Sequence, residues 1–349
     1  MSVIYHERPG VYSDFDASSV TATGSGTKIV AVIGISEADG GVYTVTSYND
    51  ATTTFGADSQ LAAMMQLAFA NGASTVMAYP VEEDDQDLYT AAATAILATK
   101  LASYMVLGTA DGDIQKAVLT LVESASSQKG ECIAFVGMEE PTVAELVARA
   151  ATLNSPRMVL VGADVYGSGD EPLGGYMAAA AVAGYLTTQT DPAVPLNGQT
   201  LSGFVGVTLQ PTDAEYDILC QGGVTALELS DGSVRVIRGI TTATTAGGVA
   251  DTTYRELTTM LIIDEVIPAI RTSLQSKFQR AKNNATTRSA IASQVVVELE
   301  SRVTREIIDS YSDLTVEADT TDPTTCVVEF SMAVTHGLNR IYLTAHITV

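Results

Sequence analysis

Short apolar segments alternate with helix-like segments through the middle of the chain, between about residues 74 and 188. The apolar segments STVMAYPV, YMVLG, CIAFVGM and RMVLVGA are bounded by Gly, Pro or Asp, and amphipathic or Ala-rich stretches lie between them. Strands that are apolar along their whole length are typical of a parallel sheet covered by helices on both faces. The sequence therefore predicts an α/β domain with a central, mostly parallel, layered sheet.

Further strand-like segments flank this region on both sides. TKIVAVIGIS precedes it as a strand, followed by YTVTSY, a turn-like NDATTTFG and a helix with Leu61, Met65 and Ala68 on one face. This piece either joins the main sheet or packs beside it. After the α/β region, FVGVTLQ has the composition of a strand, and two alternating runs flank Asp231-Gly232, a strong hairpin signal. The Thr- and Gly-rich residues 241–253 mark a domain boundary or a mobile loop.

Two helices are predicted next, and the first has a basic face. Its apolar stripe is Ile262, Val266, Ile270, Leu274 and Phe278, with a kink expected at Pro268, and the second helix buries Ile291, Val295 and Leu299. The basic residues of this stretch are Arg271, Lys277, Arg280, Lys282 and Arg288. They form either a solvated helix face or a docking surface for an acidic partner.

The two ends of the chain have the character of strands that need a partner. CVVEFSMAV and LNRIYLTAHITV alternate, and Ile341, Leu343, Ala345, Ile347 and Val349 face one way in the second of them. A terminal strand is an edge strand, and edges pair readily with other chains. The N-terminal VIYHERPGVYSDFDASS reads as an extended arm that can add a strand to a neighbour's sheet. Packing of both ends on their own subunit is the open alternative.

These patterns divide the chain into five parts. They are an extended arm, a small α/β piece, an α/β domain, an α+β C-terminal domain and a terminal strand, at residues 1–26, 27–80, 81–240, 241–334 and 335–349.

Composition excludes several classes of partner. The chain has 41 Asp and Glu against 18 Lys and Arg, so the basic patch of a nucleic-acid binder is missing overall. No secretory signal is recognisable, and the longest apolar stretch, residues 174–186, is too short to span a bilayer. Cys132, Cys220 and Cys326 lie in apolar runs without C-x-x-C spacing. Buried free thiols in a reducing compartment are expected.

No motif of catalysis or cofactor binding is found. The run from Gly24 to Lys28 lacks phosphate-loop spacing and precedes a strand instead of following one. The acidic residues 82–87 suit the start of a helix better than a calcium loop. His6, His336 and His346 lack metal-ligand spacing. We expect no catalytic, cofactor-binding or metal-binding residues, although a triad built from distant residues stays open as an alternative.

Six segments, taken together and in order, resemble the contractile tail sheath family of myophages, Mu-like phages and bacteriocin particles. They are residues 7–12 (ERPGVY), 46–56 (TSYNDATTTFG), 69–80 (FANGASTVMAYP), 172–185 (PLGGYMAAAAVAGY), 234–242 (VRVIRGITT) and 282–288 (KNNATTR). The resemblance implies a sheath subunit that forms stacked hexameric rings around a tail tube and contracts to drive the tube through a target cell envelope. It also implies a subtilisin-like middle domain without a catalytic triad.

The resemblance further implies the partners and the place of assembly. The partners are other copies of the chain, the tail tube protein, and the baseplate and tail terminator proteins, with no direct contact to nucleic acid and no membrane insertion. The particle is a virion tail or a bacteriocin-like particle assembled in the bacterial cytoplasm, and no cofactor is needed. For this family the chain is short, as expected of a sheath without outward-facing domains. The alternatives are a subtilisin-like hydrolase with an unrecognised active site, and an inner-tube protein.

Two sets of residues carry these expectations. Strands exchanged between subunits are expected at Val3, Tyr5, Pro9, Val11, Tyr12, Ile341, Leu343, Ile347 and Val349. Contact with the tube is expected at Arg271, Lys277, Arg280, Lys282 and Arg288.

Overall fold

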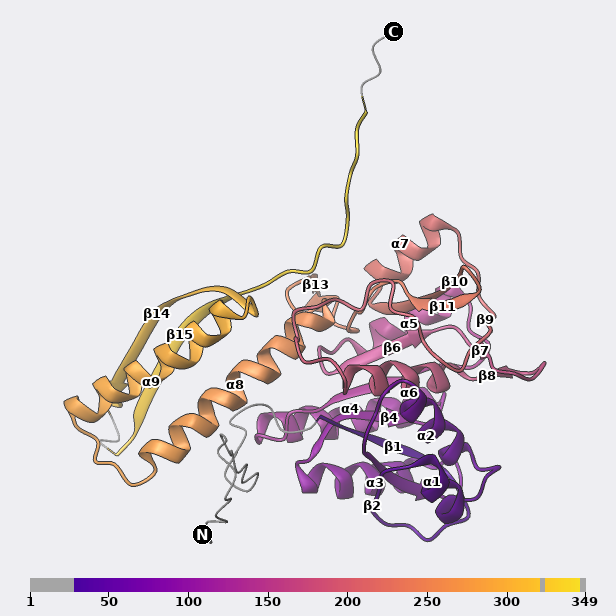
Figure 1. Ribbon diagram of the computed structural model, residues 1–349, viewed down its shortest axis with the longest axis horizontal. Helices are drawn as coiled ribbons and strands as arrows, with labels where there is room; N and C mark the ends of the chain where they lie inside the picture. The colour runs from indigo at the N-terminus through magenta and orange to yellow at the C-terminus, as the bar shows by residue number, and fades with distance from the viewer. Residues whose placement is uncertain (1–27, 321–323, 346–349) are drawn as a thin grey trace, which may run out of the picture.

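The computed structural model describes residues 28–320 and 324–345. An α/β body and a smaller C-terminal body lie side by side in it, and helix α8 (Leu257–Phe278) runs from one to the other (Figure 1). The N-terminal residues Val3, Tyr5, Pro9, Val11 and Tyr12, and the C-terminal residues Ile347 and Val349, lie outside the described residues.

The α/β body is built on an eight-stranded sheet with the order β11-β10-β6-β5-β4-β1-β3-β2. All inner pairs are parallel, and only the two outermost strands pair antiparallel with their neighbours. The predicted α/β fold with a mostly parallel sheet is therefore confirmed, and residues 29–81 join that sheet. The strands are β1 (Ile29–Ile35), β2 (Tyr43–Val45), β3 (Val76–Val81), β4 (Ala102–Leu107), β5 (Ile133–Val136), β6 (Met158–Gly162), β10 (Val224–Ser230) and β11 (Ser233–Val236).

Helices cover both faces of this sheet, as the apolar strands predict. In β1, Val30 and Val32 point to one core and Ala31 and Ile33 to the other, because side chains alternate along a strand. The first face carries α1 (Tyr48–Phe55), α2 (Gln60–Ala70) and α6 (Gly175–Leu186). The second face carries α3 (Gln86–Thr99), α4 (Gly112–Ser127), α5 (Val143–Leu153) and α7 (Asp213–Gln221).

Helix α1 replaces the turn predicted at NDATTTFG. The Ser47 side chain accepts a hydrogen bond from the Asp50 backbone N–H and caps the helix, and Ala51 and Phe55 bury one face. Burial of that face and the cap outweigh the weak helix propensity of the threonines.

The Asp231-Gly232 hairpin forms as predicted. Strands β10 and β11 pair antiparallel on either side of it, and both turn residues have positive φ, at 51° and 73°. A two-residue turn with these angles matches the twist of the strands that it joins.

The C-terminal body packs α8 and α9 (Ala285–Thr304) against a two-stranded antiparallel sheet. Its core contains the predicted stripe residues Ile262, Val266 and Ile270 of α8 together with Val295 and Leu299 of α9. The sheet joins β15 (Cys326–Val334), which was predicted, to β14 (Ile308–Ala318), which was not.

The predicted strand at residues 338–349 is absent from the described part, because residues 335–345 form no strand. Within residues 28–320 and 324–345 no strand pairs with this segment, and a strand exists only where a neighbour completes its ladder of hydrogen bonds.

Smaller elements complete the fold. In FVGVTLQ only β9 (Gly206–Val207) is a strand, and it forms a small sheet with β7 (Val165–Tyr166) and β8 (Pro172–Leu173). A short hairpin of β12 (Thr245–Ala246) and β13 (Val249–Ala250) lies in the Thr- and Gly-rich stretch. Among the helices described here, none combines the length and apolar character that crossing a membrane requires.

Candidate interaction surfaces and the junction between the bodies

The position where an open α/β sheet usually binds its ligand is filled by the chain's own side chains. Ligands bind such sheets beyond the carboxyl ends of the strands, where the strand order reverses. That point lies between β1 and β4. Here the Gln60 side chain accepts a hydrogen bond from the Ile35 backbone N–H at 2.9 Å and donates one to the Gly108 carbonyl at 2.9 Å. A Cβ at Gly108 would lie only 2.8 Å from Gln60 and Met64, so the space is closed.

Asp164, a buried carboxylate next to an open depression, has a structural role. It follows β6 and accepts hydrogen bonds from the backbone N–H groups of Glu140 at 2.6 Å and Gly175 at 3.1 Å. The second bond caps the start of α6, where a negative charge is favourable. Burial nevertheless raises the pKa of Asp164, and the two backbone hydrogen bonds oppose that rise.

Within residues 28–320 and 324–345, no three His, Cys, Asp or Glu side chains converge as metal ligands would. His336 is exposed, and His6 and His346 lie outside those ranges. Cys132 is a buried free thiol as predicted, and burial raises its pKa to about 12. Cys220 and Cys326 are also free but only half-buried, so the expectation of full burial was wrong for these two. Cys220 lies in α7 and Cys326 begins β15.

The basic residues predicted to touch the tube separate into two groups. Lys277, Arg280, Lys282 and Arg288 surround the turn between α8 and α9, which we name the basic tip. The first three are exposed, and Arg288 donates to the Asn283 side chain at 2.9 Å. Arg271 instead faces the α/β body and forms an ion pair with Glu131 at 2.8 Å. Sequence spacing could not distinguish it from the others, because Glu131 is remote in sequence.

The C-terminal segment carries large apolar side chains in water. Arg340 pairs with Asp217 of α7 at 3.9 Å, and beyond it the segment runs away from both bodies as an extended chain (Figure 1), in which Ile341 and Leu343 are 79% and 92% exposed. Its root is held by a hydrogen bond of 2.7 Å from the Asn197 side-chain amide to Asn339. Exposed apolar side chains on an extended segment indicate a surface that another chain covers.

The two-stranded sheet offers unpaired edges. One face of β15 packs Val328, Phe330 and Met332 towards the C-terminal core. Within the described residues, β14 and β15 pair only with each other. Their outer edges therefore present backbone N–H and C=O groups that can accept further strands.

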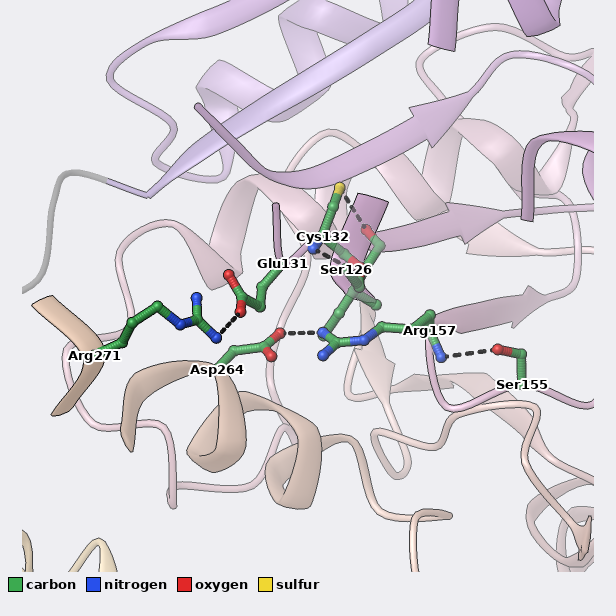
Figure 2. A network of polar contacts seen from close by, with 8 residues as sticks. Ser126, Glu131, Cys132, Ser155, Arg157, Asp264 and Arg271 are labelled. Carbon is green, nitrogen blue, oxygen red and sulfur yellow. Dashed lines mark hydrogen bonds and ion pairs between the residues drawn. The ribbon is translucent and has the colours of Figure 1, made fainter. Parts of the chain in front are cut away.

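Ion pairs, which sequence reasoning missed, join α8 to the α/β body (Figure 2). Asp264 pairs with Arg157 at 2.5 Å. Arg271, further along α8, makes the pair with Glu131 described above. Both members of the first pair are largely buried, with side chains 12% and 18% exposed. Near the start of the same helix, Glu256 pairs with Arg238.

Burial dominates the electrostatics of this junction. It raises the pKa of Asp264, and the nearby Glu131 raises it further, whereas Arg157 and Lys28 lower it. The ammonium group of Lys28 donates to the Gln189 carbonyl at 2.8 Å. Burial lowers the pKa of Lys28, although Glu265, Asp191 and Asp264 oppose that shift. The junction thus holds charged groups that have lost most of their water.

Comparison with known proteins gives relatives of one kind. The chain is 30% identical over 241 residues to the tail sheath protein of Bacillus phage SP01, covering 67% of this chain and 41% of the relative. It is 28% identical over 203 residues to the tail sheath protein of Mycobacterium phage Bxz1, covering 54% of this chain and 35% of the relative. The chain thus spans about two fifths of the length of these curated relatives.

Solved structures share the fold over nearly the whole chain. The helical sheath of the anti-feeding prophage in its contracted state matches with a TM-score of 0.74 at 18% identity, covering 98% of this chain and 99% of the other. The contracted sheath complex of the extracellular contractile injection system PVC matches with a TM-score of 0.73 at 15% identity, covering 99% of each chain. The sheath tail protein from Listeria innocua has a TM-score of 0.71 at 12% identity, covering 89% and 93%.

Family membership follows from two matched domains. Residues 83–242 match the phage tail sheath protein central domain, and residues 249–348 match the phage tail sheath C-terminal domain. These domains belong to structural tail proteins and not to a family of enzymes. Together they account for most of the sequence, and the chain therefore belongs to the phage tail sheath protein family.

Proposed function

We propose that this chain is a contractile tail sheath subunit that polymerises as stacked hexameric rings around a tail tube. The match of both sheath domains in their proper order carries this proposal. The subunit is part of the tail of a phage or of a phage-like particle, and this particle is assembled in the bacterial cytoplasm. Contraction shortens the sheath and drives the tube through the target envelope. The free energy for this is conformational, stored in the extended lattice, so no nucleotide site is required.

Strand exchange is the proposed bond between subunits. The arm residues Val3, Tyr5, Pro9, Val11 and Tyr12 and the terminal residues Ile341, Leu343, Ile347 and Val349 supply the added strands. Two observations support this: the unpaired edges of β14 and β15, and the exposure of Ile341 and Leu343. Main-chain hydrogen bonds across subunits would tether the lattice while the bodies rotate.

Further partners and the domain division belong to the same proposal. The structure of the anti-feeding prophage baseplate matches this chain with a TM-score of 0.75 at 18% identity. This match supports a baseplate protein as a partner, in addition to the tube and terminator proteins. We assign residues 1–26 and 335–349 to the exchanged ends, 27–80 and 81–240 to the α/β body with its subtilisin-like domain, and 241–334 to the C-terminal domain.

Negative-stain microscopy of the purified full chain tests polymerisation directly. We expect long, hollow, striated tubes, because a sheath subunit carries its own lattice contacts. Dispersed single particles at all protein and salt concentrations tried would contradict the proposal.

The basic tip is the proposed contact with the tube, and Arg271 is a weaker member of that set because Glu131 already pairs with it. Charged surface contacts fix register without burying the apolar area that would resist release. Replacing Lys277, Arg280 and Lys282 by Glu is expected to reduce co-assembly on purified tubes by about ten-fold or more, while tube-free polymerisation is unchanged. Co-sedimentation with tubes measures this.

A matched control has the same change of charge elsewhere. Lys100, Lys116 and Lys129 are exposed on the α/β body and are likewise replaced by Glu. Equal loss of co-assembly in both triple variants would mean that net charge, and not the basic tip, governs binding.

A further inference from the structure

Helix α8 belongs to two hydrophobic cores in succession. Leu257, Met260 and Leu261 in its first turns pack into the core of the α/β body. The half-buried Ile263 still packs against that core, whereas Ile262, Val266 and Ile270 pack into the core of the C-terminal body. The change of core falls inside one continuous helix, so any rotation of one body against the other must bend or shift α8.

Pro268 weakens α8 just beyond that change of core. Proline has no backbone N–H, so residue 268 cannot donate the helical hydrogen bond to the carbonyl of Asp264, four residues earlier. The proline ring also crowds that carbonyl. Sharp bends in helices are found at such positions. The turn from Asp264 to Pro268 is therefore the part of α8 with the least internal support.

Side chains from other elements grip this same turn. Asp264 is paired with Arg157, which lies just before β6, and its neighbour Glu265 is paired at 3.7 Å with Arg305, which follows α9. Lys28, just before β1, adds a positive charge near both carboxylates. The Asp264–Arg157 pair thus holds this turn where its own backbone hydrogen bond is missing, and the Arg271–Glu131 pair ties α8 to the α/β body just beyond Pro268 (Figure 2).

The side-chain contacts that hold this turn are polar, not apolar. The second carboxylate oxygen of Asp264, Oδ1, is buried without a hydrogen-bond partner. A buried acceptor in that state carries an uncompensated loss of hydration, which opening of the contact would return. Polar contacts between bodies of one chain are typical of interfaces that allow relative motion.

We propose that residues 264–268 of α8 are a hinge between the two bodies, and that the Asp264–Arg157 and Arg271–Glu131 pairs, which both reach the α/β body, are a latch that holds the hinge closed. The raised pKa of Asp264 supports this, because it means that Arg157 does not fully offset the cost of burying the carboxylate. Opening the latch lets the C-terminal body turn while the first turns of α8 stay in the α/β core. The hinge is a property of the single subunit and does not rest on the proposed function.

Hydrogen exchange of the full-length subunit, at a concentration and salt where it is monomeric, tests the hinge. The Pro268→Ala variant restores the missing hydrogen bond, and we expect amides 265–267 and 269–271 to exchange about ten-fold more slowly than in the wild type. Asp264→Asn opens the latch, and the exchange of the same amides is expected to accelerate about ten-fold more than that of α3. Pro211→Ala, in a loop before α7, is the matched proline control and should leave α8 unaffected.

The double variant separates a latch from a general loss of stability. With Pro268→Ala in place the helix supports itself, so Asp264→Asn should then change the exchange of the same amides, relative to that of α3, by less than about three-fold. An equal acceleration of these amides in both backgrounds, or an acceleration of α3 as large as theirs, overturns the proposal. Should Asp264→Asn not fold, Arg271→Gln loosens the Arg271–Glu131 pair and takes its place in both backgrounds.

Discussion

Deletion of residues 1–15 is expected to convert the polymer into a soluble monomer. If the arm adds a strand to the two-stranded sheet of a neighbour, its removal takes away main-chain hydrogen bonds that link each subunit to the next. The residues that form the described cores of both bodies lie between 29 and 334, so folding of the subunit should not depend on the arm. Analytical ultracentrifugation and negative-stain microscopy at the same protein concentration measure the change.

Two further measurements make this result decisive. The melting temperature of the deletion variant should stay within about 2 °C of the full chain under monomeric conditions, since surface changes away from the core are usually small. The reciprocal variant, Ile341→Asp with Leu343→Asp, should likewise lower polymerisation, because both exposed apolar side chains then carry charge. Sheath-like tubes of normal appearance from the deletion variant would show that the arm does not join the subunits.

Much of the α/β body follows from local patterns in the sequence. The short apolar runs predict buried parallel strands because a strand covered on both faces has no polar side. The Asp231-Gly232 turn and the stripe of Ile262, Val266 and Ile270 are equally local signals, and each forms as predicted. What these features share is that residues close in sequence determine them.

The features that could not be predicted from the sequence depend on residues that lie far apart along the chain. Strand β14 has a polar, acidic sequence, and it is a strand because β15 pairs with it and α9 covers one side. The segment 338–345 has strand-like alternation, but no strand among the described residues pairs with it, and it forms no strand there. Arg271 and Asp264 look like ordinary helix charges until folding brings Glu131 and Arg157 to them. Only tertiary structure distinguishes a junction charge from a surface charge.

The Arg157–Asp264 pair should show the largest effect of a single substitution on stability. Arg157→Met leaves a largely buried carboxylate without its cation, and removal of one partner from a buried pair costs about 3 kcal/mol or more. The double variant Arg157→Met with Asp264→Leu has apolar groups of similar volume in both positions, and such replacements are often neutral or stabilising. Most of the loss should therefore be recovered. Urea unfolding midpoints at constant m-value measure both changes.

A pair that is more exposed than Arg157–Asp264 provides the control. Arg235 and Asp231 lie 3.5 Å apart with side chains 32% and 84% exposed, so Arg235→Met should cost less than about 1 kcal/mol. If Arg157→Met cost no more than Arg235→Met, the junction pair would be a surface contact in energetic terms. If the double variant lost the sum of both single losses, packing and not charge would explain the cost.

The pH dependence identifies the carboxylate responsible. The pKa of Asp264 in the native state is raised above its value in the unfolded chain, so between these two values the native state binds more protons. Its contribution to the free energy of unfolding therefore falls as the pH rises through that window.

Removing Arg157 raises the native pKa of Asp264 further, because the nearest cation that lowers it is gone. Arg157→Met should accordingly regain stability, relative to the wild type, as the pH falls through the window between the raised native pKa of Asp264 and the ordinary pKa of an aspartate. The double variant, which lacks the carboxylate, should show no such gain, since the groups that face this position, Glu131, Lys28, Tyr104 and Cys132, are unchanged in both variants.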